Sequence, residues 1–234
     1  MEDMEKNTTD IDADQHLKHP GKGRAPRSLF QTGASGAVVE EQEKRESILY
    51  AAATLFADKG YAGTAVREIV EAAGITKPTL YYYFKNKEDL YIKLMDAAVE
   101  VFFQTLDRSL AVEGSMRKRL VSLFTDIYQL FESHLEMLRL VNSMVYGPSG
   151  ATPAYDITVT HAHLEKVLSQ ILGAGVAEGE LSEDNWGEVM FLLMGVMRSI
   201  QCHLVMKNLP LAFTSDRIVR IIDLIFDGAR ASRK

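Results

Sequence analysis

Apolar residues recur at the spacing of an amphipathic helix from Lys44 almost to the end of the chain. In the first such segment, four of them fall on one face at positions i, i+4, i+7 and i+8: Ile48, Ala52, Leu55 and Phe56. Lys59 and Gly60 then supply a cation for a last turn and a glycine that ends a helix. The pattern therefore predicts a first helix from about Lys44 to Gly60.

Two short helices are predicted next, with a tight turn between them. Thr64 is suited to cap the first helix, which ends at Gly74. Thr76 can cap the second, and Pro78 is tolerated in its first turn because the N–H it lacks has no partner there. The inward-facing positions are Val66, Ile69, Val70 and Ala73 in the first helix, and Leu80 and Phe84 in the second.

Asn86 is expected to cap a longer helix over 87–111. Later helices are predicted near 115–132, 134–146, 155–178, 184–207 and 214–231, with glycine and proline at the breaks between them. No run of alternating β-branched residues indicates a sheet, and no internal repeat is present. The fold class is therefore predicted to be all-α.

Composition and charge narrow the function. The chain has 234 residues and a formal net charge of -6, which argues against a protein that coats nucleic acid indiscriminately. The charge is uneven: it is -4 over 1–43, +2 over 44–94 and -4 over 95–234. A single cysteine excludes an internal disulfide framework and a cysteine-based zinc finger. Only the segment 44–94 is locally basic.

Residues 1–43 show no hydrophobic periodicity and contain recurrent glycine and proline, so a flexible tail is expected. Its Lys22, Arg24 and Arg27 can touch DNA phosphates, although a solvated linker is the favoured interpretation. The start of the chain lacks the apolar run of a secretory signal, and the longest apolar run, 189–197, is short for a membrane span. A soluble, cytoplasmic protein without a membrane partner is expected.

The segment 64–84 has the pattern of a helix-turn-helix, whose second helix enters the major groove of DNA. Lysine can reach phosphates or guanine edges, threonine can reach base edges or thymine methyls, and tyrosine hydroxyls can reach phosphates. The candidate DNA contacts are Thr64, Arg67, Thr76, Lys77, Pro78, Thr79, Tyr81, Tyr82, Tyr83 and Lys87. Taken alone, three consecutive tyrosines are more simply explained by packing.

From Ile48 to Leu94 the chain resembles the DNA-binding domain of the TetR family of bacterial transcriptional regulators. The matching residues are Ala52, Leu55-Phe56, Gly60-Tyr61, Thr64, Val66-Arg67-Glu68-Ile69, Ala72, Gly74-Ile75, Thr79-Leu80-Tyr81, Phe84-Lys85-Asn86-Lys87-Glu88 and Leu90. Pro78 departs from the glycine that many members have, and Val70 departs from the usual alanine. The resemblance covers about a fifth of the chain, and within it DNA contact becomes the favoured role of the tyrosines.

The resemblance implies an N-terminal three-helix helix-turn-helix DNA-binding domain, here 44–90, followed by a larger helical ligand-binding and dimerisation domain, 91–234. It implies a homodimeric repressor of a palindromic double-stranded DNA operator, released by a small ligand. The nearly all-round apolar segment 184–207 supports dimerisation independently, because such a helix is buried on more than one face. The candidate interface residues are Val189, Leu193, Val196, Ile200, Ile218, Ile221, Ile222 and Ile225.

A pocket for a small apolar or amphipathic ligand is also implied by the resemblance. Its candidate lining is Phe124, Tyr128, Phe131, Met137, Met144, Met190, Met194 and Met197, since methionine suits adaptable apolar cavities. For any one of these residues, plain core packing is the simpler interpretation.

Enzymatic and metal chemistry find little support. His161 and His163 stand two apart on a predicted helix and so point to different faces, and no zinc-binding motif accompanies them. Cys202 lies in an apolar helix, and no cofactor motif or paired catalytic base is visible. The alternatives to a ligand-released repressor are a DNA binder controlled by a protein partner or acting architecturally, and a helical enzyme with an incidental helix-turn-helix.

Overall fold

The computed structural model describes residues 36–148, 150–206 and 213–231, and within these ranges there is no β-strand. The predicted tail residues Lys22, Arg24 and Arg27 lie outside the described ranges. The helices are α1 Gly36–Gly63, α2 Val66–Ala72, α3 Lys77–Tyr83, α4 Lys87–Leu110, α5 Met116–Ser133, α6 Leu135–Tyr146, α7 Thr158–Ala177, α8 Trp186–Val205 and α9 Ser215–Ala231. A short 3₁₀ turn, Glu183–Asn185, precedes α8. The all-α prediction is confirmed.

The first helix begins at Gly36, eight residues before its predicted start at Lys44. Residues 36–43 read GAVVEEQE, and their apolar residues are consecutive instead of one helical turn apart, so hydrophobic periodicity could not reveal this part of α1. Its second half contains three glutamates and a glutamine, which are good helix formers, and Glu40 pairs with Lys44 one turn later at 2.7 Å. The other end agrees with the prediction, because the helical conformation breaks at Gly60, whose φ is +74°.

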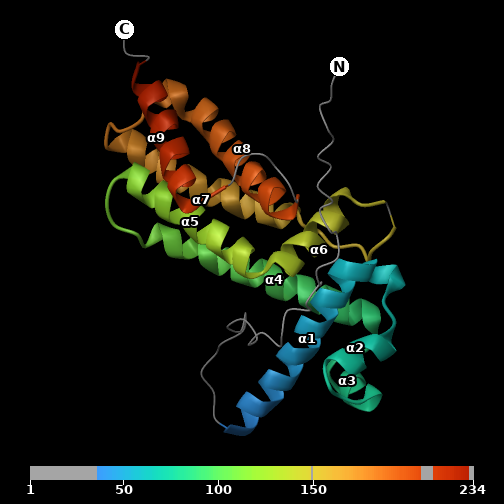
Figure 1. Ribbon diagram of the computed structural model, residues 1–234. Coiled ribbons are helices and arrows are strands. Elements are labelled where there is room, and N and C mark those ends of the chain that lie inside the picture. Colours follow the sequence, from blue (N-terminus) through green and yellow to red (C-terminus); the bar gives the residue numbers. More distant parts are fainter. Residues whose placement is uncertain (1–35, 149, 207–212, 232–234) are drawn as a thin grey trace, which may run out of the picture.

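Buried side chains form two hydrophobic clusters. We call the first the N-terminal cluster: it joins α1, α2, α3 and the start of α4, and it includes Met137 and Leu140 of α6. The second, the C-terminal cluster, joins the rest of α4 to α5, α7, α8 and α9. Figure 1 shows α2 and α3 at one tip of the molecule and α7, α8 and α9 at the other, with α4 running between them.

Helix α4 belongs to both clusters. Its first turns place Leu90, Tyr91, Leu94 and Met95 in the N-terminal cluster, and its later turns place Phe102 and Leu106 in the C-terminal cluster. The predicted cap is present, because the side chain of Asn86 accepts a hydrogen bond from the N–H of Asp89 at 2.7 Å. A single rigid helix therefore connects the two ends of the molecule.

Candidate functional site

The two short helices α2 and α3 are joined by the turn that the sequence predicts. Gly74 has a φ of +65°, in the left-handed region that favours glycine, and a side chain there would meet no neighbour within 4 Å. The N–H of Ile75 donates to the carbonyl of Val70 at 3.0 Å and closes the turn. The glycine is thus required for its backbone conformation and not for space.

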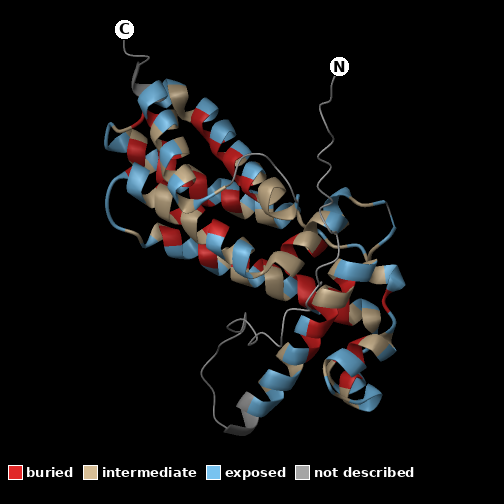
Figure 2. Ribbon diagram, viewed as in Figure 1, coloured by how far each residue is buried: buried red, intermediate tan, exposed pale blue. Residues whose placement is uncertain are grey.

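Helix α3 turns one face inward and the other to solvent. Leu80 and Phe84 are buried, as predicted, while Lys77 and Pro78 are exposed at its start. Tyr82 is 74% exposed and Tyr81 is 44% exposed. Figure 2 shows this exposed surface at the tip formed by α2 and α3. A helix anchored in this way presents lysine and tyrosine side chains to solvent, where the sequence predicts contact with DNA.

Several other candidate DNA contacts reach the same surface. The side chain of Arg67 on α2 is 86% exposed and forms an ion pair with Glu71 at 2.7 Å. The hydroxyls of Thr76 and Thr79 lie 2.8 Å apart and bond to each other at the start of α3. Tyr83 is half-buried and packs edge-on against Tyr82, with ring centroids 5.0 Å apart. Tyr83 therefore supports the exposed Tyr82 ring from behind.

Thr64 does not have the role that the sequence predicts for it. It was expected to cap α2 and to contact DNA, but the helix is capped at Ala65 and Thr64 is 2% exposed. Its hydroxyl lies within hydrogen-bond distance of two backbone carbonyls, that of Leu55 at 3.1 Å and that of Gly60 at 2.8 Å, and can donate to either. The side chain is therefore occupied in holding the end of α1, and this part of the prediction is wrong.

Lys87 also has an internal role. Its ammonium donates to the carbonyls of Tyr61, at 2.8 Å, and Thr64, at 3.0 Å, and it lies 4.3 Å from the centre of the Tyr61 ring. These bonds satisfy carbonyls that the end of α1 leaves open. The neighbouring Lys85, between α3 and α4, is exposed, and the predicted DNA contacts do not include it, because a motif match does not show which of two lysines points outward.

The early part of α1 contributes a contact that sequence reasoning missed. The hydroxyl of Tyr82 donates to the carboxylate of Glu41 at 3.2 Å, across 41 residues of sequence. The negative charge of Glu41 raises the pKa of Tyr82, because it disfavours the tyrosinate. Since residues 36–43 were predicted to belong to a tail, no local signal placed this acidic side chain beside the exposed face of α3.

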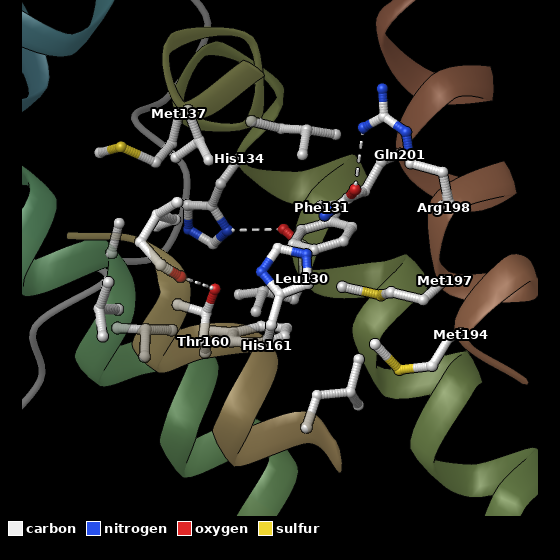
Figure 3. Close-up of a pocket in the computed structure, with 18 residues that line it drawn as sticks. Leu130, Phe131, His134, Met137, Thr160, His161, Met194, Met197, Arg198 and Gln201 are labelled. Carbon is white, nitrogen blue, oxygen red and sulfur yellow. Dashed lines mark hydrogen bonds between the residues drawn. The ribbon is translucent and has the colours of Figure 1, made fainter. Parts of the chain in front are cut away.

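A second feature is an apolar pocket between α4, α5, α6, α7 and α8, with a volume of about 120 Å³. Figure 3 shows its walls. The lining residues are Ala98, Val99, Val101, Phe102, Leu130, Phe131, His134, Met137, Leu138, Val141, Ile157, Thr160, His161, Leu164, Met194, Met197, Arg198 and Gln201. Most of the wall is aliphatic or aromatic, and the polar side chains come from α7, α8 and the residue before α6.

Half of the predicted pocket residues are in this wall: Phe131, Met137, Met194 and Met197. The other four are not among the lining residues. Phe124, Tyr128 and Met190 are buried in the C-terminal cluster, and Met144 packs against the N-terminal cluster. The polar members of the wall, such as Arg198, were missed because a search for apolar stripes passes over them.

The predicted interface residues are mostly interior. Val189, Leu193, Val196, Ile200, Ile218 and Ile222 are buried in the chain's own core, and Ile221 and Ile225 pack partly against it. The large apolar side chains that do face outward on these two helices are Phe191, 80% exposed, Leu192, 50%, and Leu224, 72%. The residues predicted to meet a partner therefore pack within the chain itself, because periodicity does not show which apolar face of a helix is the inner one.

Helix α8 and the turn before it form an unusually apolar stretch. The span Glu183–Val205 is the one described helix that is long and apolar enough to cross a membrane, by length and composition alone. A third of its most apolar window, 33%, is buried, as in a helix that packs on a core along one side. Its uncovered side carries Phe191 and Leu192.

The two histidines considered for metal binding serve packing and pairing. His163 lies 2.8 Å from the carboxylate of Asp107 and stacks on Phe103, while His161 lines the pocket. Within the described residues no group of three or more His, Cys, Asp or Glu side chains is arranged to hold a metal ion. Cys202 is a half-buried free thiol on α8.

Known proteins resemble the chain over much of this architecture. Residues 48–94 match the model of the family described as bacterial regulatory proteins, tetR family. The transcriptional repressor KstR2 of Mycolicibacterium smegmatis is 29% identical over 142 residues, which cover 60% of this chain and 69% of that protein. The transcriptional repressor ComR of Escherichia coli is 30% identical over 141 residues, covering 58% of this chain and 67% of that protein.

Among solved structures, the regulator FadR of Bacillus subtilis in complex with stearoyl-CoA shares the fold. Its TM-score is 0.56 at 18% sequence identity, with 77% of this chain and 95% of that chain covered. The helix-turn-helix at 48–94, the all-helical architecture and these relatives agree with one another. The chain belongs to the TetR family of bacterial transcriptional regulators.

Proposed function

We propose that the protein is a homodimeric repressor that leaves a palindromic operator when a small amphipathic ligand fills its pocket. The observation that carries this proposal is the continuity of α4. Met95 lies in the N-terminal cluster, and Val99, one turn later, lines the pocket. One turn of helix spans about 5.4 Å, so a shift of the pocket wall is transmitted to the DNA-binding end without an intervening joint.

Helix α6 provides a second connection. Met137 lines the pocket and also belongs to the N-terminal cluster, and Val141 packs partly against that cluster. The domain boundary is accordingly proposed near residue 90, with α6 bridging it. The pocket can be narrow, in the DNA-binding arrangement, or wider, with α4 and α6 further apart. A ligand that binds the wider arrangement more tightly lowers the affinity for DNA by the ratio of its two affinities.

The size of the pocket supports such a movement. Its volume of about 120 Å³ is well below the roughly 300–1,000 Å³ of sites that hold drug-sized molecules. A ligand of that size therefore widens the pocket on binding. The FadR structure in complex with stearoyl-CoA has the same fold, and it supports an amphipathic molecule with a long apolar body as the ligand here.

The outward faces of α8 and α9 are the proposed dimer interface. Phe191, Leu192 and Leu224 expose apolar surface that the chain itself does not cover, and a second copy related by a two-fold axis buries it. Such a dimer places its two α3 helices about one DNA turn, or a multiple of it, apart on a palindrome. The proposed location is the cytoplasm, where a bacterial operator is found.

The test is an operator-shift assay on a DNA fragment that the protein selects from a random library. Lys77→Ala and Tyr82→Ala are each expected to weaken binding about 5- to 150-fold, since a base contact contributes about 1–3 kcal/mol. Lys118→Ala, an exposed lysine at the start of α5, serves as the matched control. Unchanged affinity in both α3 variants, or one chain per palindrome in sedimentation, contradicts the proposal.

A further inference from the structure

The pocket has one charged corner, formed by Arg198 of α8. One guanidinium nitrogen of Arg198 lies 3.3 Å from the side-chain oxygen of Asn142 and 3.3 Å from that of Gln201. The guanidinium carbon lies 4.2 Å from the centre of the Tyr146 ring. All of these partners are neutral, and Arg198 forms no ion pair with any residue in the described part of the chain.

The rest of the wall does not neutralise this charge. None of the lining residues is acidic, and those from α4 and α5 are entirely apolar. Arginine remains charged at all physiological pH values, and its fork of N–H donors matches a carboxylate in shape and charge. The corner therefore offers donors and positive charge to whatever enters the pocket.

The position of Arg198 in the pocket wall also favours an amphipathic ligand. Tyr146, on which the guanidinium stacks, is 62% exposed, so Arg198 stands where the pocket meets solvent. Figure 3 shows Arg198, Gln201, Met194 and Met197 along one wall and Met137 across from them. An amphiphile can place its polar head at Arg198 and its apolar body among the methionines and aliphatic side chains, with each part in a matching environment.

His134 indicates that the interior is built to meet polar ligand atoms as well. His134 lines the pocket, and its Nδ1 donates to the carbonyl of Leu130 at 2.9 Å, so that Nε2 is left as a hydrogen-bond acceptor. Nε2 is buried and has no hydrogen-bond partner among the described residues. Because an unpaired buried polar atom is unfavourable, a ligand that presents a hydrogen-bond donor to Nε2 gains affinity by satisfying it.

We infer that the effector is an anionic amphiphile, with one carboxylate held by Arg198 and Gln201 and an aliphatic or alicyclic body in the apolar part of the pocket. The inference rests on the proposed function, in that it specifies the ligand of the same pocket. It assigns Arg198 as the residue that distinguishes an acid from the corresponding alcohol or cation.

The experiment measures binding to the full-length protein by calorimetry with three probes of equal chain length: decanoate, 1-decanol and decyltrimethylammonium. Decanoate is expected to bind best. Arg198→Met is expected to weaken decanoate binding about 10- to 100-fold and to leave 1-decanol nearly unchanged, since hydrogen bonds to a charged group are the stronger ones. Arg198→Lys keeps the charge without the fork and is expected to recover part of the loss.

Lys118→Met is the matched control, because it removes an exposed cation about 18 Å along α5 from the pocket residue Leu130. Thermal unfolding without ligand establishes that each variant is folded. Decanoyl-CoA is a fourth probe: if it binds tightly and free decanoate does not, the head group is a thioester and the inference is wrong. If the wild-type protein binds its operator but binds decanoate and 1-decanol equally well, the inference about the carboxylate is wrong, while the proposed function stands.

Discussion

The helix-turn-helix end and the pocket end of this molecule are built from different kinds of information. Around α3, each element begins or ends at a local signal: the positive φ of Gly60 and Gly74, and the caps of Thr76 and Asn86. Around the pocket, the wall comes from helices as far apart in sequence as α4 and α8, and no short segment contains enough of it to be recognised.

The two ends also differ in packing. Leu80 and Phe84 fill the space beneath α3 and fix its orientation, whereas the pocket keeps a volume of about 120 Å³ open. A close-packed interior resists deformation, while an incompletely filled one can change shape at lower cost. In the function proposed above, the close-packed end contacts DNA, and the less completely filled end, joined to it through α4, senses the ligand.

The largest expected effect tests this difference in packing. Leu80→Ala is expected to destabilise the protein by about 3–5 kcal/mol, near the upper end for such changes, because Leu80 is surrounded on all sides. Leu138→Ala, its matched partner in the pocket wall, is expected to cost about 2–3 kcal/mol, since one side of Leu138 already faces a void. Urea unfolding measures both, and equal losses would contradict the distinction.

The next effect separates structural from DNA-contacting lysines within the helix-turn-helix end. Lys87→Met removes the ammonium that donates to the carbonyls of Tyr61 and Thr64. The free energy of unfolding is expected to fall by about 1–3 kcal/mol, because these carbonyls lose their hydrogen-bond donor. Lys85→Met removes an exposed lysine and is expected to weaken DNA binding and reduce its salt dependence, with little change in stability. If both variants lose only DNA affinity, Lys87 contacts phosphate after all.

The smallest effect concerns the contact between α1 and α3. Glu41→Gln keeps a hydrogen-bond acceptor for Tyr82 but removes a negative charge beside the DNA-facing surface. DNA affinity is expected to rise about two- to fivefold at low salt, the size of a single exposed charge interaction, and the gain is expected to disappear as salt screens it. Glu43→Gln provides the control, and an equal gain in that variant would assign the effect to net charge alone.

Much of the helix-turn-helix end was predictable from sequence because its determinants are local. The helix breaks at Gly60 and Gly74, the cap at Asn86 and the inward orientation of Leu80 all follow from residues within a turn or two of the position concerned. Thr64 and Lys87 were exceptions. Thr64 bonds to the carbonyl of Leu55 and Lys87 to that of Tyr61, both in α1, and a partner nine or more residues away cannot be deduced from spacing.

At the pocket and at the helix faces of α8 and α9, sequence identified apolar residues without identifying what they contact. Met137 and Met190 have the same side chain on amphipathic helices, yet one lines the pocket and the other fills the core. Val189 and Phe191, two positions apart, differ in exposure from 2% to 80%. Whether an apolar side chain lines the pocket, fills the core or faces solvent depends on which helix, if any, packs against its side of its own helix.

The sequence by itself determined the helical class, the helix-turn-helix and the family resemblance, because helix periodicity, caps and turn glycines act over a few residues. Only the tertiary structure decided that the predicted interface residues face inward, that Glu41 meets Tyr82 and that Arg198 lines an apolar pocket with no acidic partner among the described residues. These depend on contacts between helices distant in sequence, and such contacts are selected by packing of the whole chain.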